Sequence, residues 1–186
     1  DEAQRKARAM LTSWTDSEFA MHVQQLPLVY WTGFDSYSHV WHAELCAKFR
    51  RGDAPLLIDF RPDAAKRMTE LTILTADDPG LFSRIAGAVA AAGVNIAGAR
   101  ITTCHDGTVL DVFFLQDMHN AAIESAEDLE KIRGILEKAL RGEFRLEKAL
   151  DARWEQTPLR VRQLPVPSRV MLSNKISSTH TVIEVN

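Results

Sequence analysis

Four consecutive residues, Asp77-Asp78-Pro79-Gly80, could bind a small charged molecule where a predicted strand is followed by a predicted helix. The first turn of a helix has unpaired backbone N–H groups and a partial positive charge, so it attracts a carboxylate, and Gly80 would let that group approach the backbone. Asp77 or Asn95 could hold an ammonium or an amide, since we expect Asn95 to begin the next strand beside this turn. An amino acid carries both charges. The predicted ligand-binding residues are Asp77, Asp78, Pro79, Gly80, Leu81, Asn95 and Ile96.

The same turn also has a purely structural interpretation. Asp-Pro-Gly makes a good strand-to-helix turn, with Asp78 as the N-cap and Pro79 at the first helical position, where its missing N–H costs nothing. Asn95 would then be only a residue at the start of a strand. The residues alone leave both interpretations open.

No set of residues predicts catalysis. The chain has no P-loop, no G-x-S-x-G nucleophile turn and no H-E-x-x-H zinc motif. Asp77 and Asp78 are adjacent, but neighbours in a tight turn diverge, so they make a poor acid–base pair. We therefore expect a regulatory or binding function, with no catalytic residue and no cofactor in this chain.

A metal site is also not expected. His39 and His42 lie three residues apart on a predicted helix and could share a metal, but only Asp35 and Cys46 are at all near ligand spacing. We interpret both histidines as surface or capping residues.

Composition limits the class of function. The chain has 186 residues, of which 46% are apolar and 25% charged, and a net charge of −3, which gives no basic surface for nucleic acid. No apolar run approaches the roughly 18 residues of a membrane helix, and the charged first residues do not form a signal peptide. Cys46 and Cys104 are the only cysteines and suit reduced thiols. A cytoplasmic location is the expectation.

Apolar periodicity and turn signals predict the elements around the candidate site. A strand over residues 70–76 leads to a helix that begins at Pro79, has Leu81, Ile85 and Val89 on its apolar face, and ends at Gly93. Extended runs over 94–104 and 108–116 flank the hairpin signal His105-Asp106-Gly107. Ser125-x-x-Asp128, a capping box with Asp in place of Glu or Gln, begins a helix over 125–140, and a short helix over 143–154 follows.

This order predicts an α+β fold, a ferredoxin-like βαββαβ sandwich with its helices on one face of the sheet. The last strand could be residues 170–172 or residues 181–185. Both belong to an internal repeat, in which residues 55–60 align with 167–172 and residues 69–74 with 181–186. The end of the chain is therefore interpreted as the start of a second copy.

Residues 1–54 form a predicted helical segment, with helices over 1–11, 16–26 and 35–50. An aromatic cluster lies within it, and we leave open whether this is a docking surface between domains or a small packed core: Tyr30, Trp31, Phe34, Tyr37 and Trp41. The expected parts are residues 1–54, a helical linker; 55–155, a first domain; and 156–186, a linker with the first strands of a second. We expect this chain to be a fragment of a longer protein.

Three blocks carry a resemblance to a known family: LPLVYWTGFDSYSHVWHA at 26–43, ADDPGLFSRIAGAVAAAGVNIAGARITT at 76–103 and SSTHTVIEVN at 177–186. The central block resembles an ACT domain. All three, in this order, resemble the C-terminal ACT region of the bacterial bifunctional PII uridylyltransferase/uridylyl-removing enzymes.

The resemblance implies a function for the chain and for the protein around it. ACT domains typically bind amino acids at the turn and at an ACT–ACT interface, so a dimer of such domains and L-glutamine as the ligand are expected. The whole enzyme would attach UMP to a tyrosine of the PII protein and remove it, with Mg²⁺, through nucleotidyltransferase and HD domains upstream of this chain.

The alternative is an ACT sensor from another amino-acid-regulated protein, without uridylyl transfer. The aromatic block at 26–43 favours the first interpretation. A ferredoxin-like RNA binder is disfavoured, because Phe113 and Phe114 lie among acidic neighbours on an acidic chain.

Overall fold

The computed structural model describes residues 2–52, 54–156, 169–173, 175 and 182–185. The chain divides into two compact units, Asp1–Leu146 and Glu147–Asn186. The first unit contains a four-stranded antiparallel sheet in the order β1-β2-β4-β3, formed by β1 (Leu56–Asp63), β2 (Met68–Ala76), β3 (Asn95–Arg100) and β4 (Thr108–Gln116). The predicted α+β, ferredoxin-like class is confirmed.

Helices α4 (Leu81–Ala91) and α5 (Ala126–Leu140) cover one face of this sheet. Their apolar stripes meet alternate residues of the strands in an aliphatic core that centres on Ile73, Ile85, Phe113 and Leu136, all fully buried. The side chain of Ser125 accepts a hydrogen bond from the backbone N–H of Asp128 and caps α5, as predicted.

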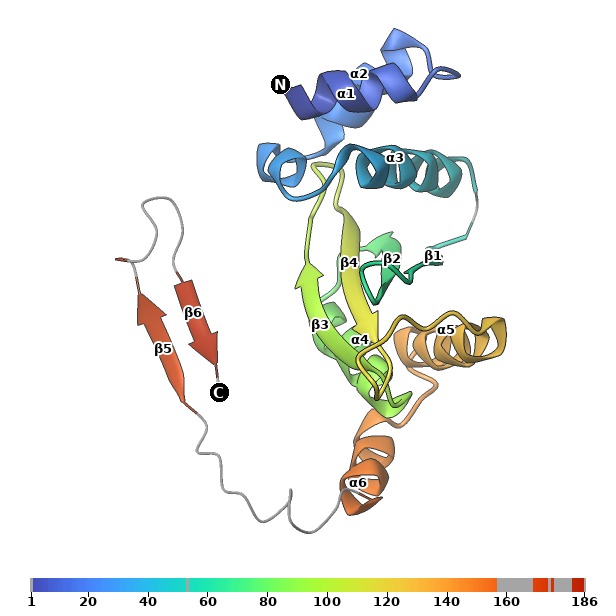
Figure 1. Cartoon of the computed structure of the whole chain (residues 1–186), viewed down its shortest axis with the longest axis vertical. Helices are drawn as coiled ribbons and strands as arrows, with labels where there is room; N and C mark the ends of the chain where they lie inside the picture. The colour runs from blue at the N-terminus through green and yellow to red at the C-terminus, as the bar shows by residue number, and fades with distance from the viewer. Residues whose placement is uncertain (1, 53, 157–168, 174, 176–181, 186) are drawn as a thin grey trace. The chain divides into compact units, whose positions relative to one another are not determined.

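The other face is covered by the N-terminal segment: α1 (Glu2–Met10), α2 (Asp16–Gln25), the 3-10 helix η1 (Leu28–Thr32) and α3 (Ser36–Arg51). In Figure 1, strands β1 and β2 lie between α3 and α5. Tyr30 and Trp31 pack with Leu74 and Leu110 from the sheet. The two helices of the predicted unit, α4 and α5, lie on one face as expected, and the aromatic cluster of the N-terminal segment supplies the apolar cover for the second face. Tyr37 alone of the cluster is largely exposed.

The position next to β2 at the sheet edge belongs to β1. The sequence offered residues 170–172 or 181–185 for this strand, and neither takes it in the described part of the chain. β1 reaches the position through a short turn into β2, so that Ile58 lies opposite Ile73 and Phe60 opposite Leu71. The fourth strand of the sheet thus comes from the start of the expected domain 55–155 and not from the end of the chain.

In the second unit, β5 (Val170–Ser173) pairs with β6 (Val182–Val185), and α6 (Leu146–Gln156) precedes them. The pairing repeats that of β1 and β2 at an offset of 112 residues (58 to 170 and 73 to 185), with Val170 opposite Val185 and Leu172 opposite Ile183. The predicted repeat therefore extends to strand register, although residues 174 and 176–181 lie outside the described residues. Among the helices described, none is both long and apolar enough to cross a membrane.

Candidate functional site

The turn from Asp77 to Gly80 is exposed throughout and joins the end of β2 to the start of α4. Gly80 is the residue before the helix and has a left-handed conformation (φ 78°), which explains why glycine is found there. The backbone N–H of Leu81 donates to the carbonyl of Asp78 at 3.0 Å, closing the turn. The interpretation of Asp78 as N-cap and Pro79 as first helical residue was wrong, since both precede Gly80.

Asp78 instead forms an ion pair with Arg84, one turn into α4. The same guanidinium donates to the carbonyl of Pro79 at 3.2 Å. No side chain caps the N-terminus of α4. The turn therefore presents helix-end N–H groups beside a carboxylate and a guanidinium, as a site for a zwitterion requires.

A pocket of about 340 Å³ opens beside this turn. Asp78, Leu81 and Arg84 line one side of it, and Glu137 and Arg141, near the end of α5, line another. Glu137 and Arg141 are ion-paired at 3.5 Å. Two pairs of opposite charges thus line the same pocket.

Asn95 and Ile96 do not lie beside this turn, so that expectation was wrong. Ala76 pairs with Thr108 at the start of β4, whereas Asn95 pairs with Gln116 at its end. The two positions are separated by the length of β4, roughly 26 Å at about 3.3 Å per residue. The reason is topological: α4 returns the chain to the end of the sheet where β2 began. No small ligand can contact both groups within one domain, and the ligand-binding role of all seven residues stays a prediction.

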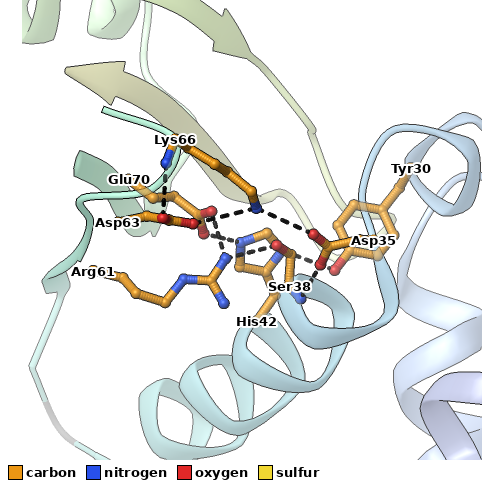
Figure 2. Close-up of polar contacts among 8 residues, drawn as sticks. All are labelled: Tyr30, Asp35, Ser38, His42, Arg61, Asp63, Lys66 and Glu70. Atoms are coloured by element: carbon orange, nitrogen blue, oxygen red, sulfur yellow. Dashed lines mark hydrogen bonds and ion pairs between the residues drawn. The ribbon is translucent and has the colours of Figure 1, made fainter. Parts of the chain in front are cut away.

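A buried polar network joins the N-terminal segment to the sheet, and the sequence analysis missed it (Figure 2). His42 on α3 is fully buried; its Nε2 lies 2.9 Å from a carboxylate oxygen of Glu70 on β2, and its Nδ1 lies 3.0 Å from the Tyr30 hydroxyl. Arg61 on β1 donates to the other Glu70 oxygen and to the Ser38 hydroxyl, both at 2.6 Å. Each residue of this network is hydrogen-bonded to a residue from another helix or strand.

Charges and protons in this network are fixed by its geometry. Burial alone would raise the pKa of Glu70, but the His42 hydrogen bond and the charges of His42 and Arg61 outweigh it, so the pKa is lowered. An ionised carboxylate only accepts hydrogen bonds, so Nε2 of His42 carries a proton and donates it to Glu70. When His42 is neutral, its Nδ1 accepts from the Tyr30 hydroxyl.

The histidine interpretation also needs correction. His39 and His42 are both buried, not surface or capping residues. In the described part of the chain no three His, Cys, Asp or Glu residues gather as metal ligands. The signal that could have revealed part of the network is a pair of opposite charges, Arg61 and Glu70, on two strands joined by a short turn, where they lie opposite each other.

Other ionisable groups are buried singly on the two faces. Asp111, on the strand face that also carries Val109 and Phe113, is 2% exposed, and burial raises its pKa to about 6 despite a hydrogen bond from the Thr102 backbone. His22, on α2, lies edge-on to Trp31, and burial lowers its pKa to about 3. Neither Asp111 nor His22 belongs to a site that the sequence predicted.

Comparison with known proteins finds one matching domain family and several similar enzymes. The ACT domain family matches residues 69–140. Bifunctional uridylyltransferase/uridylyl-removing enzymes are similar over most of the chain: that of Rhodospirillum rubrum is 39% identical over 96% of this chain, that of Gluconobacter oxydans 41% over 84%, and that of Azospirillum brasilense 40% over 99%. The chain spans about a fifth of the length of these relatives, with 19%, 17% and 20% covered.

Proposed function

Since this chain contains an ACT domain and is related to one region of the bifunctional uridylyltransferase/uridylyl-removing enzymes, we propose that it is the amino-acid-sensing regulatory region of such an enzyme. The signal it senses is L-glutamine. The protein it controls through the whole enzyme is PII, which is uridylylated when glutamine is scarce and deuridylylated when glutamine is abundant. The observation that carries the proposal is similarity over nearly the whole chain, including the N-terminal helices, and not over the ACT domain alone.

The catalytic steps belong to domains other than this one. The described residues include no group of three possible metal ligands, and we propose that other domains of the enzyme hold the Mg²⁺ of uridylyl transfer. We place the enzyme in the cytoplasm. What this region can contribute is binding energy. A ligand shifts the balance between two activities only if it binds one arrangement of the domains more tightly than the other.

The turn 77–80 supports a carboxylate-binding role for this region. It is exposed, it precedes a helix without a side-chain cap, and it is flanked by both signs of charge. Asn95 and Ile96 would contribute to the same ligand only from a second ACT domain. The edge strand β3 favours such pairing, because it is exposed along its length and Ile96 and Ile101 leave apolar surface there.

Calorimetric titration and thermal shift with the twenty amino acids test the proposal on this chain and on the full-length enzyme. We expect L-glutamine to raise the melting temperature; at about 100 times its Kd it adds about 2.7 kcal/mol to the free energy of unfolding. In the full-length enzyme, glutamine should then slow uridylyl transfer and speed removal. If glutamine binds neither form, or binds without changing either rate, glutamine sensing is refuted.

A further inference from the structure

The N-terminal segment is joined to the sheet by hydrogen bonds near both ends of β2. The network around Glu70 lies near the start of that strand. At its other end, the turn between β3 and β4, residues 104–108 (the hairpin turn), contacts both α2 and the turn 77–80. Glu70 is separated from Asp77 by the length of β2, roughly 23 Å at about 3.3 Å per residue. The hairpin turn, and not the network, is therefore next to the proposed ligand site.

A backbone hydrogen bond attaches the hairpin turn to the N-terminal segment. The N–H of His105 donates to the carbonyl of Gln25, the last residue of α2, at 2.9 Å. Beside this bond, the buried side chain of Cys104 belongs to the same core cluster as Leu26 and Cys46. The cavity that Gln25, Leu26 and the two cysteines line has a volume of only about 20 Å³. Because little free space remains, a shift of the hairpin turn displaces the end of α2.

A second backbone hydrogen bond attaches the hairpin turn to the turn 77–80. The N–H of Asp77 donates to the carbonyl of Gly107 at 3.0 Å, and Ala76 pairs with Thr108 where the two strands meet. Asp77 therefore uses its backbone to hold the hairpin turn. Its side chain stays exposed and is available to the ammonium of an amino acid.

The hairpin turn is stiff enough to transmit a displacement between these two attachments. The N–H of Gly107 donates to the Cys104 carbonyl at 3.0 Å, and the N–H of Cys104 donates to the Thr108 carbonyl at 2.7 Å. The Asp106 carboxylate accepts from the N–H of Thr108 at 2.9 Å. Gly107 has a left-handed conformation (φ 82°), which a residue with a side chain adopts at a cost. These restraints leave the turn few ways to change shape, so it moves as one piece.

We infer that the hairpin turn couples the turn 77–80 to the N-terminal segment, so that an amino acid bound at 77–80 changes how α2 is held. The path begins with the hydrogen bond from Asp77 to Gly107 and ends with the hydrogen bond from His105 to Gln25. The inference rests on the proposed function for its ligand, but the coupling is a property of the ligand-free chain. Since coupling between two sites is reciprocal, a change at His105 alters the opening of the hydrogen bond at Asp77.

Replacing His105 by proline removes one end of the path and leaves the other in place. His105 is the second residue of the turn that the Gly107-to-Cys104 hydrogen bond closes, and a left-handed glycine after a type I turn is typical of a three-residue hairpin loop. Proline is favoured at this second position. The His105 side chain is exposed, so neither proline nor alanine disturbs a buried contact. His105→Pro lacks the N–H that the Gln25 carbonyl accepts, whereas the matched control His105→Ala keeps it.

Amide hydrogen exchange of the ligand-free chain measures the coupling. We expect the Asp77 N–H to exchange at least about threefold faster in His105→Pro than in His105→Ala, since the loss of one hydrogen bond eases local opening by about this factor. The N–H of Asn120 donates to Asp117 in a loop at the opposite end of the sheet, so its exchange should be the same in both variants. Equal exchange of the Asp77 N–H in the two variants would overturn the coupling.

Glutamine titration of the full-length enzyme separates this inference from the proposed function. At saturating glutamine, the rates of uridylyl transfer and removal should respond normally in His105→Ala and at least about fivefold less in His105→Pro. Equal responses in the two variants would overturn the inference and leave the proposed function standing. Faster exchange of Asp77 in His105→Pro, without glutamine binding to any form, would support the coupling and refute glutamine sensing.

Discussion

The two faces of the ACT sheet are covered by different kinds of core. The α4–α5 face is aliphatic, with Ile73, Ile85 and Leu136 fully buried and one isolated carboxylate, that of Asp111. The face under the N-terminal segment is aromatic, and it contains a connected polar network that runs from Tyr30 through His42 to Glu70 and Arg61. Apolar packing is tolerant of small shifts, whereas a hydrogen-bonded chain holds only in one geometry. The first face therefore supplies stability, and the second fixes how the N-terminal segment sits on the domain.

The largest expected effect lies on the aliphatic face. Phe113 is fully buried and stacks on Phe82, which is 49% exposed. Phe113→Ala should lower the free energy of unfolding by about 3–5 kcal/mol, since it leaves a cavity in the core. Phe82→Ala, the control, should cost about 1 kcal/mol or less, and urea denaturation measures both. Similar losses for the two rings would mean that this face is not the main source of stability.

Breaking the connected network is the next largest perturbation. Glu70→Ala leaves His42 and Arg61 without their shared carboxylate, so we expect a loss of about 3 kcal/mol. The control, Asp63→Ala, breaks the exposed ion pair with Lys66 at the turn between β1 and β2. It should lower the free energy of unfolding by less than about 1 kcal/mol. Protease cleavage between α3 and β1 should accelerate in Glu70→Ala only. Equal cleavage rates in both variants would argue against a role in fixing the N-terminal segment.

The two faces should respond oppositely to pH. The folded-state pKa of Asp111 is raised to about 6 from 3.8, so its contribution is complete below about pH 4 and is lost as the pH rises through 6, by about 2–3 kcal/mol at pH 8. The pKa of His22 is lowered to about 3 from 6.5, so stability falls as the pH drops below 6.5, by about 2 kcal/mol at pH 5.

Urea denaturation between pH 4 and pH 8 of Asp111→Asn and His22→Phe separates these opposing contributions, which overlap between about pH 4 and 6.5. Asp111→Asn should remove the loss of stability that develops as the pH rises from about 4 to 6, and His22→Phe should remove the loss that develops as the pH falls below 6.5. An unchanged pH profile in both variants would show that neither group titrates as its burial implies.

The elements with strong periodicity could be predicted from sequence, while the partners of polar residues could not. β4 was predicted with the bounds that it has, 108–116, and α5 with Ser125 at its start. Asn95 was placed at the wrong end of the sheet because a residue's place along the chain does not say where the crossover helix returns. His42 could not be assigned to Glu70, since a contact between residues 28 positions apart leaves no local pattern.

Only part of the candidate site could be predicted from the sequence. The turn 77–80 and its charges were identified from sequence, but the pocket beside it depends on the end of α5 and the start of β1. Those segments meet only because β1 occupies the edge next to β2. A repeat visible in sequence revealed the β1–β2 unit, and its place in the sheet required the structure.

The strand order β1-β2-β4-β3 also bears on how the protein is made. All four strands lie between residues 56 and 116, and the second covering helix ends at Leu140. Domains fold as units while synthesis proceeds from the N-terminus. The first sheet can therefore close while the repeated hairpin is still inside the ribosome, and the two hairpins of identical register do not compete for the same edge at the same time.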